Sequence, residues 1–274
     1  MTVMPTLIGC ARMYAPSPSL AAAWATLFAR VSAASRVDLE VIDHAYPAPL
    51  DDLWAREDMG CVFMCGYPWA LRAERPRLLA APVPSPARYG GRPVYFTDFV
   101  VRADSRFETL EDTFGARLAF SIESSHSGYN APRHHLLAYR TAARPTFYAE
   151  TVGPLVSPRR VLDAVLGGRA DVGPVDSYLF DLWRRHLPEL TGAVRVVATT
   201  EPAPIPPLVA SPMIDEAMCK RLTEALLGAH SDPDLAPTLD TLLLTGFAEV
   251  TPERFEVFVE RQRAAESAGY PLLA

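Results

Sequence analysis

Residues 117–136 read RLAFSIESSHSGYNAPRHHL, and this stretch shows the pattern that decides the fold. The apolar run at residues 117–121 predicts a buried strand, and the spacing from about Tyr129 to Thr141 predicts a helix. The turn between them is rich in hydroxyl groups. A strand that leads through a turn into a helix is the repeating unit of an α/β protein.

The rest of the chain repeats this alternation of short apolar runs and helical patterns. We therefore predict an α/β fold with two mixed or parallel sheets and flanking helices. The predicted strands are residues 6–13, 37–42, 61–64, 78–82, 94–102, 117–121, 147–150, 171–175 and 194–199. The predicted helices are residues 19–34, 50–57, 109–112, 129–141, 158–166, 178–186, 216–227, 237–244 and 252–268, so the C-terminal part is expected to be mostly helical.

Two strands, Val94–Arg102 and Val194–Thr199, bracket a middle block of about 90 residues that has its own βα series. This organisation is typical of one lobe inserted into another. The sequence predicts a first lobe of residues 1–98 and 197–274 and an inserted second lobe of residues 99–196. The chain would cross between the lobes twice, which makes a two-strand hinge.

Charge and composition exclude several classes of protein. The chain of 274 residues has 26 Lys and Arg against 32 Asp and Glu, a formal net charge of −6, and no long basic run, so nucleic acid is not an expected partner. No run of about 18 apolar residues predicts membrane insertion, and the N-terminus lacks the pattern of a signal peptide. Either a leader was removed and the protein is periplasmic, or the protein stays in the cytoplasm.

No cofactor, metal ion or catalytic group is predicted. Cys61 and Cys65 lie in an apolar run that predicts a strand, where they would be about 13 Å apart, beyond the roughly 7 Å that a disulfide spans. The four cysteines lack CxxC spacing and paired histidine ligands, so a metal site is not expected. Ser127-Gly128 lacks the G-x-S-x-G pattern of a hydrolase nucleophile.

The hydroxyl-rich turn has two interpretations. The N–H groups at the start of a helix have no partner within the helix, and they bind anions through geometry and the helix dipole. Ser125, His126 and Ser127 would then line an anion site. Alternatively, Ser125 or Ser127 only caps the helix. The sequence leaves both interpretations open.

The chain resembles the phosphate- and phosphonate-type substrate-binding proteins of ABC transporters, which have the type 2 periplasmic binding protein fold. The resemblance extends over nearly the whole length. Its most specific part is Ser125-His126-Ser127-Gly128-Tyr129 with Pro132, which is similar to the Ser-Thr-Ser-Gly-Tyr loop and proline that enclose the anionic group in that family. Supporting motifs are residues 95–97 and 99–105, the strand end 171–176, Gly66-Tyr67, and residues 204–207.

The resemblance implies a set of ligand-binding residues. They are Tyr67, Tyr95, Thr97, Ser125, His126, Ser127, Gly128, Tyr129 and Asp176. Hydroxyl and amide groups would donate to the oxygen atoms of the anion, and Asp176 would accept from a ligand amine or a protonated oxyanion. Asp176 is equally suited to cap the following helix. Independently of the resemblance, Tyr14, Trp54 and Trp69 lie in or near loops after first-lobe strands, where they would either pack against the ligand or belong to the core of the lobe.

Two departures from the family pattern bear on specificity. His126 stands where the family has threonine, and the family's Gly-Ser-His turn is reduced to Ser157-Pro158, with Arg159 or Arg160 as the nearest positive charges. We predict a solute-binding protein, not an enzyme. It would capture a phosphonate, phosphate ester or related oxyanion or zwitterion in the cleft between its lobes by hinge closure. The alternatives are an enzyme resembling those of the menaquinone pathway and a ligand-sensing domain.

Overall fold

The computed structural model describes residues 6–274 and divides the chain into two compact units. The first unit contains residues up to 94 and residues 204–254, and the second contains residues 95–203 and 255–274. The prediction placed the whole of residues 197–274 in the first lobe. This was wrong for residues 255–274, which we call the C-terminal segment, because their helix packs on the helix that follows residue 130. The predicted boundaries were also wrong for residues 95–98 and 197–203, which belong to the second unit.

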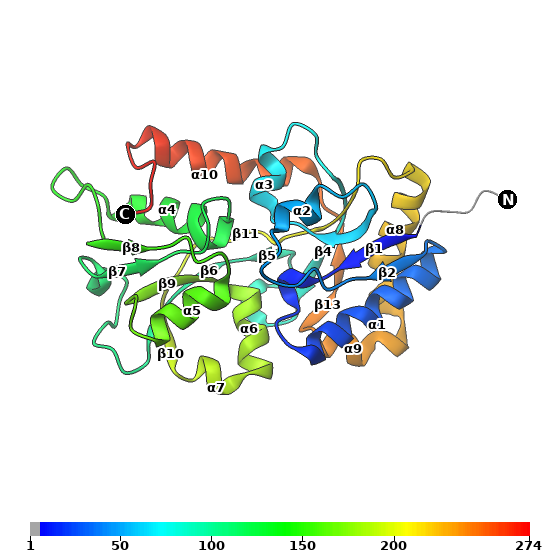
Figure 1. Cartoon of the computed structure of the whole chain (residues 1–274), viewed down its shortest axis with the longest axis horizontal. Helices are drawn as coiled ribbons and strands as arrows, with labels where there is room; N and C mark the ends of the chain where they lie inside the picture. The colour runs from blue at the N-terminus through cyan, green and yellow to red at the C-terminus, as the bar shows by residue number, and fades with distance from the viewer. Residues whose placement is uncertain (1–5) are drawn as a thin grey trace. The chain divides into compact units, whose positions relative to one another are not determined.

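The first unit is built on a six-stranded mixed sheet with the order β13-β4-β12-β3-β1-β2 (Figure 1). Strand β1 is parallel to β2 and β3, whereas β12 is antiparallel to both β3 and β4. The strands are β1 (Leu7–Cys10), β2 (Leu39–Val41), β3 (Met59–Phe63), β4 (Arg77–Pro84), β12 (Leu208–Ala210) and β13 (Leu244–Ala248). The helices are α1 (Pro18–Ser35), α2 (Leu50–Trp54), α3 (Gly66–Leu71), α8 (Glu216–Gly228) and α9 (Ala236–Thr241).

The second unit has a five-stranded mixed sheet with the order β10-β6-β9-β7-β8. Strand β7 is parallel to β8 and β9, and β6 is antiparallel to β9 and β10. The strands are β6 (Thr97–Arg102), β7 (Arg117–Ala119), β8 (Glu150–Val152), β9 (Val172–Asp176) and β10 (Val194–Thr199). The helices are α4 (Ala131–Leu136), α5 (Pro158–Leu166), α6 (Ser177–His186), α7 (Pro188–Thr191) and α10 (Glu256–Ser267).

A separate two-stranded sheet pairs β5 (Val94–Tyr95) with β11 (Ala203–Pro204). These residues are the points at which the chain passes between the two units. The predicted strand 94–102 is therefore broken at Phe96. Its longer part, β6, pairs with β10 inside the second unit.

Local sequence signals account for the start of α5. The side chain of Ser157 caps this helix by accepting from the Arg160 N–H, and Pro158 occupies the first turn, as predicted.

Two strand predictions in other parts of the chain were wrong. The strand predicted at residues 147–150 lies instead at β8, Glu150–Val152, which pairs with β7. The sequence also missed β13 in the C-terminal part, where Gly246 adopts a positive φ of 148° and interrupts the strand pattern.

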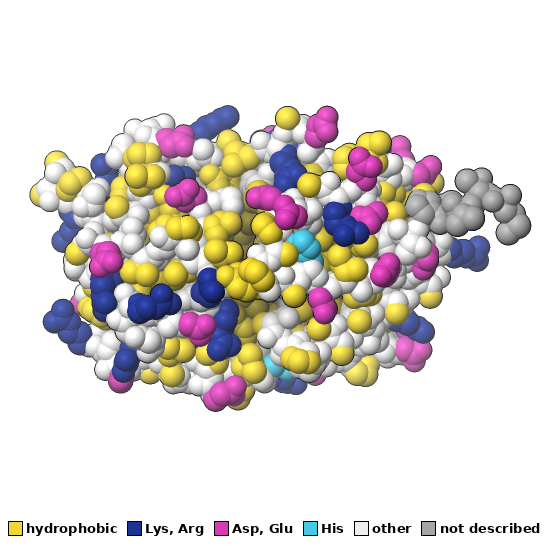
Figure 2. Space-filling model, in the orientation of Figure 1, with side chains coloured by type: hydrophobic (Ala, Val, Ile, Leu, Met, Phe, Trp, Pro, Cys, Tyr) yellow, Lys and Arg dark blue, Asp and Glu magenta, His cyan; other side chains and the backbone are white. Residues whose placement is uncertain are grey.

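The surface and the cysteines agree with the composition. All four cysteines are buried. The predicted strand through Cys61 and Cys65 ends at Phe63, and Cys65 lies at the start of α3 (Gly66–Leu71). Acidic and basic side chains are interspersed over the face shown in Figure 2. Among residues 6–274, no helix combines the length and the apolar character needed to span a bilayer.

The core of the first unit depends on the ring of Phe63 at the end of β3. This ring packs edge-on against Tyr14 and Trp24, with centroid distances of 5.0 Å to each. We expect Phe63→Ala to lower the free energy of unfolding by about 3–5 kcal/mol, because removal of the ring leaves a cavity that the neighbouring side chains cannot fill. Urea unfolding measures this loss. Val41→Ala, at a side chain that is 40% exposed, should change stability by less than about 0.5 kcal/mol. Equal effects of the two variants would contradict the assignment of Phe63 to the core.

Candidate anion-binding site

Residues 121–130, which we call the serine loop, connect β7 to α4 in the second unit. Ser125 organises the loop, because its hydroxyl accepts from the Gly128 N–H at 3.0 Å and its carbonyl accepts from the Asn130 N–H at 3.0 Å. The second bond closes a π-turn over His126–Asn130, which continues directly into α4. Turns of this kind are rare in proteins, and those that occur often lie at functional sites. The predicted capping role of Ser125 is therefore confirmed.

Gly128 is required by the close approach of Ser121. A Cβ atom at residue 128 would lie 1.9 Å from the Ser121 Oγ and 2.9 Å from its Cβ, so any larger residue would displace the end of the strand. Ser121 is 2% exposed, and its hydroxyl has no hydrogen-bond partner in the described part of the chain. A buried hydroxyl without a partner costs free energy, and functional sites are where such groups are retained.

The serine loop also offers backbone donors. The N–H groups of Gly128 and Asn130 are bonded to Ser125, but those of His126 and Ser127 donate to no acceptor in residues 6–274. The Ser127 side chain makes no hydrogen bond within these residues either. The loop thus combines two unused amides with the hydroxyls of Ser121 and Ser127, a set of neutral donors suited to oxyanions.

Strands β6 and β9 support this loop from the neighbouring part of the sheet. Thr97 lies opposite Asp176 in the register, and the Thr97 hydroxyl donates to the Ser127 carbonyl at 3.1 Å. Asp176 accepts from the Leu179 N–H at 3.0 Å and caps α6. The ring of Tyr95 lies 6.0 Å from that of His126. Thr97 and Tyr95 therefore contact the serine loop, and Asp176 lies beside Thr97 on the adjoining strand.

His126 is buried, at 1% exposure, and its ring contacts Phe258 of α10 at a centroid distance of 4.4 Å. Its Nε2 atom lies 3.2 Å from Nη1 of Arg261, and its Nδ1 atom lies 3.3 Å from the Asn130 amide nitrogen. The guanidinium and the amide NH2 group can both only donate, and a neutral imidazole can accept from one of them, whereas a protonated ring could accept from neither. Burial, and then the charge of Arg261, holds the pKa of His126 well below its usual value. His126 is therefore a neutral part of the support beneath the loop.

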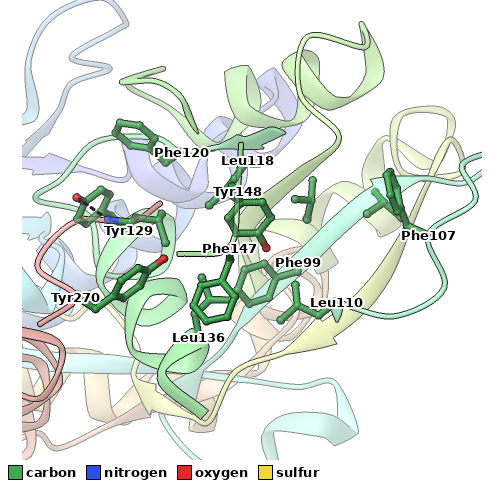
Figure 3. Packing of buried hydrophobic residues seen from close by; sticks show 13 residues of the cluster. Phe99, Phe107, Leu110, Leu118, Phe120, Tyr129, Leu136, Phe147, Tyr148 and Tyr270 are labelled. Carbon is green, nitrogen blue, oxygen red and sulfur yellow. Dashed lines mark hydrogen bonds between the residues drawn. The ribbon is translucent and has the colours of Figure 1, made fainter. Parts of the chain in front are cut away.

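Tyr129 points into the core of its own unit. Figure 3 shows its ring in a cluster with Phe120 and Tyr270. The Tyr129 hydroxyl accepts from the Leu273 N–H at 3.2 Å, so the C-terminal segment holds this side chain in place. Tyr129 can contribute to a site through its backbone, whereas its hydroxyl is already bonded.

Tyr67, the site residue predicted in the first unit, lies in α3 and is 6% exposed. Its contact with a ligand stays a prediction. The sequence missed Ser121 as a donor, although it belongs to the quoted stretch. It also missed Arg261 and Arg133, because nothing in the pattern of α10 or α4 marks a charged residue as buried.

Arg133 is the second buried guanidinium, and it lies on α4. It is 5% exposed, donates to the Asn130 side-chain oxygen at 3.0 Å and to the Pro271 carbonyl, and lies over the Tyr129 ring. Its Nε atom has no hydrogen-bond partner in the described residues. These contacts fix the first turn of α4 against the C-terminal segment.

The family model for the phosphonate ABC transporter periplasmic substrate-binding protein matches residues 13–255. The chain belongs to this family. The family consists of substrate-binding proteins rather than enzymes, and the chain is accordingly a solute-binding protein of an ABC transporter, with a small ligand and the transporter as partners. A search of curated protein sequences found no match.

Solved structures of substrate-binding proteins have the same fold. The binding protein component of an ABC phosphonate transporter from Pseudomonas aeruginosa aligns with a TM-score of 0.79 and 15% identity over 97% of this chain and 88% of that protein. PhnD1 from Prochlorococcus marinus, in complex with methylphosphonate, gives a TM-score of 0.76 and 15% identity, with 95% and 98% covered. XAC2383 from Xanthomonas citri, bound to ATP, gives 0.65 and 24%, with 96% and 98% covered. The predicted α/β fold of the periplasmic binding proteins is confirmed.

The neutral state of His126 predicts how the stability of this substrate-binding protein depends on pH. The pKa of His126 is lowered in the folded protein, so below about pH 6.5 the unfolded chain binds a proton that the folded chain does not. The contribution of the neutral His126 ring to stability is thus fully present well above pH 6.5, and it is lost progressively as the pH falls below this value. We expect His126→Gln to reduce this loss by about 1 kcal/mol between about pH 6.5 and 5.5.

Urea unfolding at several pH values measures this difference. His134 and His135, whose pKa values are also lowered by burial, account for part of the remaining loss. An identical pH dependence in the wild type and His126→Gln would contradict the neutral assignment.

Proposed function

We propose that the serine loop receives the anionic group of the transported solute, a phosphonate, a phosphate ester or a related oxyanion. The observation that carries this proposal is that the serine loop holds four donors without an acceptor in residues 6–274, namely the hydroxyls of Ser121 and Ser127 and the amides of His126 and Ser127. An oxyanion with several oxygen atoms can accept from all of these donors together. The protein binds the solute without changing it.

The surrounding residues complete this proposed site. Thr97 holds the Ser127 carbonyl and so orients the donors of the loop. Tyr95 and Asp176 lie on the adjoining strands, where Asp176 would receive an amino group if the solute is a zwitterion. Participation of Tyr67 and closure of a hinge stay predictions from the family resemblance. Export to the periplasm, where this family of substrate-binding proteins acts, is also part of the proposal.

Two structural relatives provide ligands with which to test the site. The Prochlorococcus protein was solved with methylphosphonate and the Xanthomonas protein with ATP. Both compounds present a tetrahedral phosphorus with several oxygen atoms. We therefore propose that methylphosphonate, inorganic phosphate and ATP are the first probes for this chain.

At least one of these probes should raise the melting temperature of the protein, because a ligand that binds only the native state stabilises it. In the Ser125→Ala/Ser127→Ala variant the dissociation constant should rise on the order of 100-fold, since loss of the Ser127 hydroxyl removes a hydrogen bond to a charged group, worth about 1.5–3 kcal/mol, and loss of the Ser125 cap loosens the loop. Thermal unfolding with each probe, followed by isothermal titration calorimetry, measures both effects.

Thr109→Ala is a matched control in the same unit. Its hydroxyl also accepts from the N–H three residues later, but it is exposed and lies outside the loop. This variant should lose a little stability and keep the affinity of the wild type. Unchanged binding in the double serine variant, or no stabilisation of the wild type by any probe, would overturn the proposed site.

A further inference from the structure

The serine loop rests on a buried positive charge, against which residues 6–274 place no buried acidic side chain. Arg261 of α10 is 6% exposed, and its guanidinium donates to the Pro202 carbonyl at 2.8 Å and contacts His126 at 3.2 Å. Its nearest carboxylate, that of Glu201, is 3.9 Å away and belongs to a side chain that is 79% exposed. Arg261 therefore keeps most of its charge uncompensated inside the second unit.

An uncompensated buried charge is costly, because the guanidinium has lost its hydration without gaining a close counter-ion. Burial lowers the pKa of Arg261 but leaves the group a cation. His126, which lies between Arg261 and the loop backbone, is neutral and cannot cancel the charge. The field of Arg261 thus reaches the donors of the serine loop through an uncharged residue in a buried environment.

The position of α10 is fixed by contacts that leave Arg261 little freedom. The Asn130 side chain donates to the Phe258 carbonyl at 2.9 Å, one turn of α10 before Arg261. The same asparagine lies at the end of the π-turn. The distance from the guanidinium to the loop is therefore set by the packing of α10 rather than by a mobile side chain.

We propose that Arg261 is a positioning and specificity residue that favours a doubly charged oxyanion over a singly charged one of the same shape. This inference rests on the proposed function of the serine loop and assigns the charge of its solute. The neutral donors of the loop fit the tetrahedral oxygens of phosphonates and sulfonates equally well. The buried guanidinium adds an electrostatic attraction that grows with the negative charge of the ligand.

The test compares methylphosphonate, a dianion at about pH 8.5, with methanesulfonate, which has the same tetrahedral shape and one negative charge. The wild type should bind methylphosphonate more tightly. In Arg261→Gln this preference should fall about tenfold, and Arg261→Lys, which keeps the charge, should retain most of it. Calorimetric titration of both compounds gives the ratio of dissociation constants, which a merely structural role of Arg261 would not change.

Glu201→Gln provides an independent arm at an exposed position, where folding is not at risk. Removing the carboxylate should raise the preference for methylphosphonate about twofold, because solvent screens most of its present effect. If Arg261→Gln does not fold, this variant and Arg261→Lys decide the question.

The possible results separate the two proposals. Wild-type binding of methylphosphonate with the same preference in Arg261→Gln and Glu201→Gln would overturn the role of Arg261 and leave the serine loop as the site. Equal affinity of the wild type for the two compounds would also overturn the role of Arg261. A wild type that binds neither these compounds nor phosphate and ATP would overturn the proposed function together with this inference.

Discussion

The contact between the buried guanidinium of Arg261 and the ring of His126 joins the last helix to the serine loop, and the second unit depends on it. A buried cation must find acceptors, and here they are an imidazole nitrogen and the Pro202 carbonyl. This requirement brings together residues that are 135 positions apart in the sequence. Neighbouring bonds from Asn130 to Phe258 and from Leu273 to Tyr129 strengthen the same junction.

These contacts between the C-terminal segment and the serine loop explain how the neutral donors of the loop stay fixed although some of them have no acceptor. The backbone of the π-turn is held by Ser125 from one side and by the C-terminal segment from the other. In the proposed site, the donors of Ser121 and Ser127 would therefore need little rearrangement to bind an oxyanion, so little of the binding free energy would be lost to ordering them. A substrate-binding protein must also release its solute to the transporter, and hydrogen bonds from neutral groups, with a positive charge set behind them, suit reversible capture.

The sequence of the serine loop resembles the family motif, but two of its side chains make other contacts than the resemblance implied. His126, where the family has threonine, faces inward and supports the loop instead of lining it. Tyr129 similarly uses its ring and hydroxyl within the core of the second unit (Figure 3). The donors that are left for a solute come from the backbone and from small hydroxyl side chains, which can approach a tetrahedral anion closely.

The sequence by itself determined the features that depend on neighbouring residues. The alternation of apolar runs and helical spacing predicted the α/β fold, and Ser157-Pro158 and Ser125 marked helix starts because a cap acts within one turn. Only the tertiary structure decided that residues 255–274 join the second unit, that β13 pairs with β4, and that Arg261 is buried against His126. Those outcomes depend on contacts between segments far apart in the chain, and an arginine on a helix has the same local pattern whether water or a buried ring faces it.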